Sequence, residues 1–131
     1  MEAQRPIRLG VFGPFLRLIK VKSDNAYVEL RDEGLFISFG YIEAEVPYAN
    51  MASVKIDRWP VLGGVGLRVW SDQTMGYIGA LGSAVWIALK EAQTLKAGPG
   101  SMSLDRRNVA LTMVDDEGLL KALEERLQPG A

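Results

Sequence analysis

Residues 35–48 constrain the fold of this chain more than any other stretch. Their sequence, LFISFGYIEAEVPY, alternates apolar and polar side chains before and after Gly40. A period of two is typical of strands with one buried face and one solvated face. We therefore expect two antiparallel strands that turn back at Gly40. The residues expected on the buried face are Leu35, Ile37, Phe39, Ile42, Ala44 and Val46.

The segments on both sides show the same alternation. Val28 and Leu30 share one face of a strand over residues 26–31. A turn follows this strand, and Gly34 in that turn is expected to take a positive φ angle. Pro47 ends its strand because it has no N–H group for the ladder. Short strands separated by turn signals indicate a sandwich or a small barrel. Further strands are expected within residues 15–21, 48–59, 65–70, 75–79 and 106–114.

Residues 83–95 are ambiguous between a helix and a strand. Their sequence, SAVWIALKEAQTL, begins with a residue that caps helices and contains many good helix formers. As a strand, the segment would turn Val85, Ile87 and Leu89 inward and Trp86 outward. It would also cover a sheet edge that is otherwise open. We predict the strand on this ground.

The C-terminal part is expected to contain a loop and a helix. Residues 96–105 are rich in Gly, Ser and Pro, and they predict a mobile surface loop. Asp115 or Asp116 then caps a helix over residues 116–127, in which Gly118 should lower stability by about 1 kcal/mol relative to Ala. An apolar stripe on this helix predicts that it packs on the core. The stripe consists of Leu119, Leu120, Leu123 and Leu127.

The order of these elements is similar to the pleckstrin-homology-like (PH-like) split barrel, in which a meander of strands is closed by a C-terminal helix. The segments AYVELRDEGLFISFGYIEAEVPYANMASVKIDRW, GVGLRVW, GSAVWIAL and RRNVALTMVDDEGLLKAL resemble bacterial PH-like domain proteins of the actinobacterial type. This resemblance covers about residues 26–127. It implies a mainly β fold, a split barrel of about seven or more antiparallel strands closed by one helix. It implies no catalytic residue.

Length and composition indicate one globular domain. The chain has 131 residues, of which 48% are hydrophobic and 24% are charged. A chain of this size can bury a core without disulfides, so we expect a single domain over residues 1–131 with an irregular segment at residues 1–14. The net charge of -1 gives no electrostatic reason to expect a nucleic-acid partner.

The chain contains neither histidine nor cysteine, which limits its chemistry. Disulfides, thiolate nucleophiles, the usual general base and the commonest metal ligands are thereby removed. Ser83 has no histidine partner, which excludes the chemistry of serine hydrolases. Glu43 and Glu45 are expected to be solvated charges on an outward strand face rather than an acid–base pair. We expect no catalytic residue, no cofactor and no metal.

Two groups of side chains are candidates for an interaction surface. The tryptophans offer large aromatic area with a polar N–H group, although core packing is the expected role of at least two of them. The basic residues near the N-terminus would suit an anionic membrane surface, although solubilising charge is their expected role. The candidates are Trp59, Trp70, Trp86, Arg17, Lys20 and Lys22.

These observations favour a non-enzymatic binding or interaction module. Its partner would be another protein, or a second copy that pairs along an exposed strand edge. The alternative is a small-molecule or lipid carrier with an apolar ligand in the barrel or under the helix. An enzyme that uses Asp, Glu or Tyr is a third hypothesis, and it requires residues 83–95 to be helical. The N-terminus lacks a signal-peptide pattern and no run of about 18 apolar residues occurs, so we expect a cytoplasmic protein.

Overall fold

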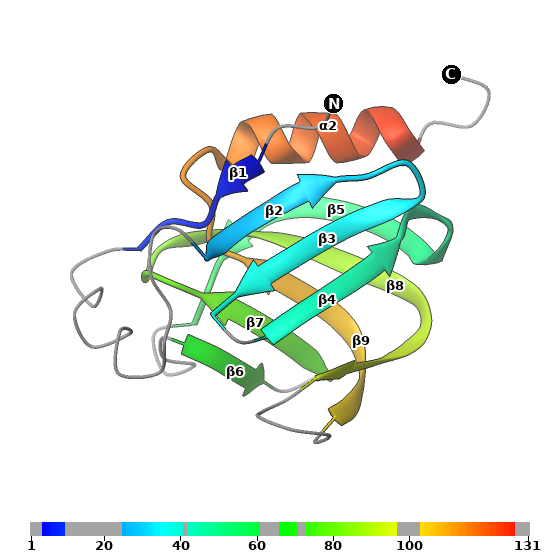
Figure 1. The fold of residues 1–131 in the computed structure, drawn as a ribbon, viewed down its shortest axis with the longest axis horizontal. Coiled ribbons are helices and arrows are strands. Elements are labelled where there is room, and N and C mark those ends of the chain that lie inside the picture. The colour runs from blue at the N-terminus through cyan, green and yellow to red at the C-terminus, as the bar shows by residue number, and fades with distance from the viewer. Residues whose placement is uncertain are drawn as a thin grey trace.

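The protein consists of two β-sheets and one C-terminal helix, which confirms the prediction of a mainly β fold (Figure 1). The structure is a computed structural model that describes residues 4–9, 25–40, 42–60, 66–70, 73–96 and 103–127. For residues 66–70, 96 and 103–105 it describes the backbone. The described elements are β1 (Gln4–Pro6), β2 (Ala26–Leu30), β3 (Gly34–Phe39), β4 (Ile42–Pro47), the 3-10 helix η2 (Tyr48–Asn50), β5 (Met51–Arg58), β6 (Gly66–Trp70), β7 (Thr74–Ile78), β8 (Ser83–Lys96), β9 (Ser103–Leu111) and α2 (Asp116–Leu127).

The first sheet has four antiparallel strands in the order β1-β2-β3-β4. The residues of β2 and β3 expected to face the core are buried, as predicted, although Ser38 on the outer side of β3 is buried as well. Gly40 takes a φ of 67° at the predicted turn between β3 and β4, a value that favours glycine. Pro47 is the last residue of β4, as predicted.

The second sheet has five strands in the order β5-β8-β9-β7-β6. Strand β8 covers the ambiguous segment, so the prediction of a strand is confirmed there. Val85, Ile87 and Leu89 are buried in the core, as expected. The expectation of only antiparallel strands is wrong at one position, since β7 and β9 run parallel. Parallel pairing requires a crossover, and β8 lies between these two strands in the chain.

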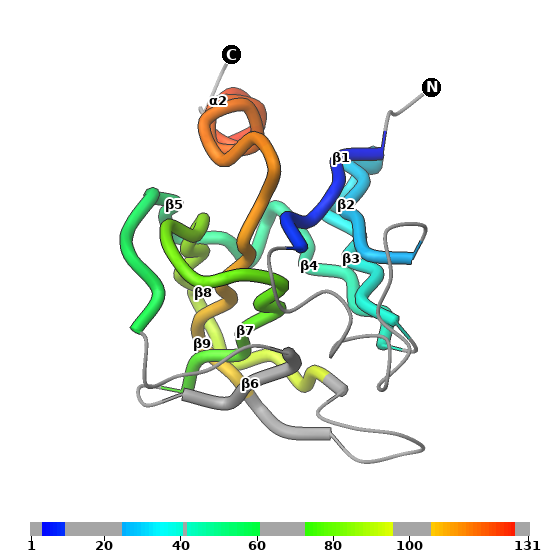
Figure 2. The backbone as a smooth tube through the Cα atoms, turned by 90° about the vertical axis from the view of Figure 1, so that its left-hand side faces the viewer, coloured from blue at the N-terminus to red at the C-terminus, as the bar shows by residue number. Residues whose placement is uncertain are grey.

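The hydrophobic core lies between the two sheets, and α2 closes the open end between them (Figure 2). Leu119 and Leu123 of α2 are fully buried, while Leu120 and Leu127 of the predicted stripe are partly buried. A smaller cluster lies on the outer face of the second sheet. It contains Trp59, Ile78, Ala84 and Ala110, with Trp86 packed against them.

Asp115 is the N-cap of α2, because its Oδ1 accepts a hydrogen bond of 3.0 Å from the backbone N–H of Gly118. A Cβ atom at position 118 would collide with the carboxylate of Asp115. Glycine at this position therefore leaves room for the capping side chain, which offsets part of the low helix propensity that the sequence predicts.

Two segments expected to be irregular contribute strands. Within residues 1–14, β1 pairs with β2, and Ile7 forms a bridge with Met113 that links the two sheets at one corner. Pro6 is tolerated because β1 is an edge strand. Lys96 is the last residue of β8, and it pairs with Ser103 at the start of β9 (Ser103–Leu111), so the loop expected at residues 96–105 is too long at both ends. The strand expected at residues 15–21 lies outside the described residues.

Gly34 serves a different purpose from the one expected. It lies in β3 without a positive φ angle. A Cβ atom at this position would lie 2.7 Å from the carbonyl oxygen of Val46 in β4. Glycine is therefore required for the close approach of two backbones rather than for a turn.

Candidate functional site

The structure brings Trp59 and Trp86 together on the outer face of the second sheet. Their ring centroids are 5.6 Å apart, and the Trp86 indole N–H donates to the carbonyl oxygen of Asp57 at 3.3 Å. Trp59 is fully buried, so its ring is not accessible to a partner. Trp86 is partly buried and contributes some exposed aromatic area. The side chain of Trp70 lies outside the described residues, as do Arg17, Lys20 and Lys22.

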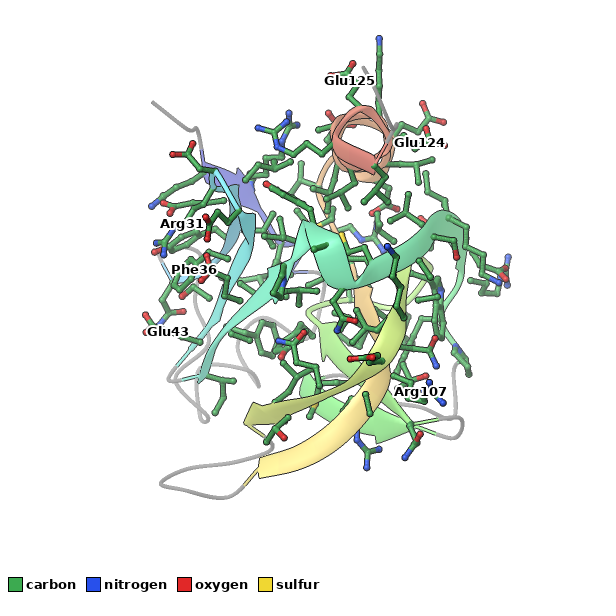
Figure 3. All side chains as sticks on the ribbon, turned by 90° about the vertical axis from the view of Figure 1, so that its right-hand side faces the viewer. Arg31, Phe36, Glu43, Arg107, Glu124 and Glu125 are labelled. Carbon is green, nitrogen blue, oxygen red and sulfur yellow. The ribbon has the colours of Figure 1, made fainter. Side chains whose placement is uncertain are left out.

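A second group of side chains lies on the outer face of the first sheet, and we call it the Arg31–Phe36 face. The guanidinium carbon of Arg31 lies 3.8 Å from the centroid of the Phe36 ring, a cation–π contact. Arg31 is also held by an ion pair of 3.0 Å with Glu29. Figure 3 shows Arg31, Phe36 and Glu43 pointing away from the body of the molecule. The face consists of Tyr27, Glu29, Arg31, Phe36, Glu43 and Glu45.

Strand register places three of these residues in one row. Glu29 of β2 and Glu45 of β4 both lie opposite Phe36 of β3, one on each side. Opposite residues of neighbouring strands are close enough for their side chains to touch. Phe36 is therefore an aromatic side chain flanked by two carboxylates. Sequence alternation predicts that Glu29 and Glu45 point outward, but it does not predict that Phe36 lies between them.

The charge of the Arg31–Phe36 face is mainly negative. Its only cation, Arg31, is already paired with Glu29. Glu43 and Glu45 are exposed and form no ion pair within the described part of the chain. The adjoining turn adds two further exposed carboxylates, Asp32 and Glu33.

A polar junction connects the start of α2 to both sheets. Asp116 is nearly buried, and its carboxylate accepts hydrogen bonds from the Ser83 hydroxyl at 2.5 Å and from the Met113 N–H at 2.9 Å. The guanidinium of Arg8 lies 3.8 Å from the same carboxylate and donates to the carbonyl oxygen of Ser83 at 2.9 Å. Each group has a structural partner, so we interpret the junction as a brace for α2.

The hydroxyl of Tyr77 is buried in the core without a hydrogen-bond partner among the described residues. The ring contacts Phe39 edge-on, with centroids 6.0 Å apart. Burial raises the pKa of Tyr77, because the phenolate would be poorly solvated there. The sequence of β7 gives no sign of the unpaired hydroxyl, since all five residues of this strand are buried and none is marked as outward.

No group of three or more Asp and Glu side chains is placed to hold a metal ion in the parts of the chain that the structure describes. Within the same parts, no helix is both long enough and apolar enough to cross a bilayer. Comparisons of the chain with protein-family models, curated proteins and solved structures return no match.

Proposed function

We propose that this chain is a non-enzymatic interaction module of the cytoplasm, built on a PH-like scaffold, that binds a basic segment of another protein. The Arg31–Phe36 face is the binding surface. The observation that carries this proposal is the row in which Glu29, Phe36 and Glu45 lie side by side on three strands. A carboxylate pairs with lysine or arginine, and an aromatic ring attracts the same cations through its face.

Arg31 illustrates the chemistry that the partner would use. Its guanidinium occupies one part of the face, stacked on Phe36 and paired with Glu29. The carboxylates of Glu43 and Glu45 have no such cation within the described residues. A partner with two basic side chains would supply the missing cations. The same negative charge disfavours an anionic membrane at this surface.

The test is a binding measurement with lysine- and arginine-rich peptides, monitored by amide chemical shifts of the labelled protein. We expect the largest shifts in β3 and β4, and affinity that falls with salt. The variant Glu43→Lys/Glu45→Lys should weaken binding roughly tenfold or more, because two attractive pairs of about 0.5 kcal/mol each become repulsive.

The matched control is Glu124→Lys/Glu125→Lys, which makes the same change of charge on α2. Both glutamates are exposed, and Figure 3 shows them on the helix, away from Phe36. This control should leave peptide affinity within about twofold of the unchanged protein. Equal losses in the two variants would show that net charge alone attracts the peptides, and the proposal would be wrong.

A carrier of a small apolar ligand is the second candidate. The unpaired hydroxyl of Tyr77 in the core favours it, since a bound molecule with one polar atom would supply the missing hydrogen bond. Native mass spectrometry of the purified protein distinguishes the two functions. A retained molecule that disappears in Tyr77→Phe would support the carrier.

A further inference from the structure

Strand β5 is an edge strand of the second sheet, and no described strand pairs with its outer side. It pairs with β8 along one side and is the first strand in the order β5-β8-β9-β7-β6. Lys55, Asp57 and Arg58 are exposed, while Val54 and Ile56 are partly buried. An edge strand carries N–H and C=O groups without ladder partners, and these groups can pair with another chain.

Hydrogen bonds of β5 show which residues direct their backbone to the open edge. The N–H of Trp59 donates to the carbonyl oxygen of Gly82 at 2.8 Å, so Trp59 faces β8. Backbone direction alternates along an antiparallel strand, so Asp57 and Lys55 face β8 as well. The carbonyl oxygen of Asp57 agrees, because it accepts from the indole of Trp86 in β8. The backbones of Val54, Ile56 and Arg58 therefore point to the open edge. Among the described residues, the backbones of Val54 and Ile56 have no partner there.

We infer that two copies of this chain associate through their β5 strands, paired antiparallel with Ile56 opposite Ile56 of the second copy. The charges on the outer face select this register. It places Lys55 directly opposite Asp57 of the second copy, and by two-fold symmetry Asp57 opposite Lys55. Registers shifted by one backbone hydrogen-bonding step place Lys55 opposite Lys55 or Asp57 opposite Asp57, which is repulsive.

The charged side chains of β5 have local partners that a second copy could replace. Within one copy Lys55 and Asp57 form an ion pair of 3.6 Å, although their side chains are 68% and 61% exposed. The Asp57 carboxylate also accepts the N–H of Arg58 at 2.8 Å. On association the second copy would take over both interactions, since Arg58 N–H would join the ladder opposite Val54 and Asp57 would pair across the interface.

The edge formed by β4 is unsuited to self-pairing. Gln93 donates to the carbonyl oxygen of Glu45 at 2.6 Å, and Pro47 has no N–H to offer. The backbone N–H and C=O groups of Glu45 therefore point to the open edge of β4, and by alternation those of Glu43 do so too. In antiparallel pairings of two β4 strands that are centred on residues 43–45, a glutamate of one copy would lie opposite a glutamate of the other. Carboxylates opposite carboxylates are repulsive, so β4 excludes a second copy whereas β5 attracts one.

The test is sedimentation velocity of the full chain over a range of concentrations, with charge variants. We expect a dimer, and we expect Lys55→Asp or Asp57→Lys to raise its dissociation constant about tenfold or more, because each places like charges opposite one another. The double variant Lys55→Asp/Asp57→Lys should restore the dimer, since opposite charges face each other again. Lys121→Glu on α2 is the control and should leave the dimer unchanged.

Three results would overturn the inference. The first is an unchanged protein that stays monomeric up to about 0.5 mM, a range that reveals even weak association. The second is a dimer that persists in Lys55→Asp, which would place the interface elsewhere. The third is a double variant that is folded by circular dichroism but does not recover the dimer. Glu43→Lys/Glu45→Lys should retain the dimer, which separates this inference from the function proposed for the Arg31–Phe36 face.

Discussion

Replacing Tyr77 by phenylalanine removes one oxygen atom from the middle of the core. The hydroxyl has no hydrogen-bond partner among the described residues, and the side chain is 0% exposed. In the unfolded chain the same hydroxyl bonds to water, so folding loses that interaction without replacement. We therefore expect Tyr77→Phe to increase the free energy of unfolding, although most substitutions in a core decrease it.

The magnitude follows from two opposing contributions. An unpaired buried hydroxyl costs about 1–3 kcal/mol. Its removal leaves a void of roughly 12 Å³, which costs about 0.3 kcal/mol at about 24 cal/mol per Å³. The net gain should be about 0.7–2.7 kcal/mol. This gain should appear as a rise in Tm of roughly 3–5 °C per kcal/mol for a chain of this size.

Urea denaturation followed by tryptophan fluorescence measures the effect, with two tyrosines as controls. The Tyr48 hydroxyl donates to the carbonyl oxygen of Arg31 at 2.7 Å, so Tyr48→Phe should lose about 1 kcal/mol. Tyr27 is partly exposed on the first sheet, and Tyr27→Phe should change stability by less than about 0.5 kcal/mol. A loss of about 1 kcal/mol in Tyr77→Phe would refute the reasoning, because it would mean that the hydroxyl has a partner.

The pH dependence of stability provides a second readout for the same residue. Burial raises the pKa of Tyr77 above its value of about 10 in the unfolded chain. Below about pH 10 both states keep the proton, and this residue gives no pH dependence. Above that pH the unfolded state loses the proton first, so the free energy of unfolding falls by about 1.4 kcal/mol per pH unit. The advantage of Tyr77→Phe over the unchanged protein should therefore grow above about pH 10.

Two further predictions concern the brace of α2 and the approach of β3 to β4. Asp116→Ala should lower the free energy of unfolding by about 2–3 kcal/mol, because the Met113 N–H and the Ser83 hydroxyl lose a charged acceptor. Ser83→Ala should lower it by only about 1 kcal/mol. Equal losses of the two variants in urea denaturation would contradict this prediction. Gly34→Ala should cost about 1–3 kcal/mol, because the new methyl group meets the carbonyl oxygen of Val46 at 2.7 Å; a Tm within about 1 °C of the unchanged protein would contradict the contact.

Strands with one solvent-exposed face could be predicted from the sequence. In β2 and β4 the side chains alternate between the core side and the outer side, and burial follows this alternation closely. In β5 the same alternation is weaker, because Val54 and Ile56 are only partly buried between exposed residues. Strand β8 was harder, since helix formers such as Ala and Leu dominate its local preference. Its backbone pairs with β5 on one side and β9 on the other, and this tertiary pairing outweighs the propensity.

Features that depend on pairing partners could not be predicted. Residues 109–113 are all buried, so they carry no alternation that would reveal the parallel pairing of β7 with β9. Strand β1 has only three residues and includes Pro6, which argues locally against a strand. The contact of Arg31 with Phe36 crosses a turn, so it depends on the register of β2 and β3. The sequence does not show that the Tyr77 hydroxyl lacks a hydrogen-bond partner among the described residues, because this depends on how the core packs around it.

The two proposed interactions use opposite parts of the molecule. Figure 2 shows the strands β1–β4 on one side and β5 on the other, with α2 above the space between them. A second copy joined at β5 would leave both Arg31–Phe36 faces exposed, so the dimer would present two acidic faces to one partner. Two linked sites raise the apparent affinity for a partner with repeated basic segments, because the second contact forms within an existing complex. Weak exposed ion pairs, each worth about 0.2–1 kcal/mol, can support useful binding in this way.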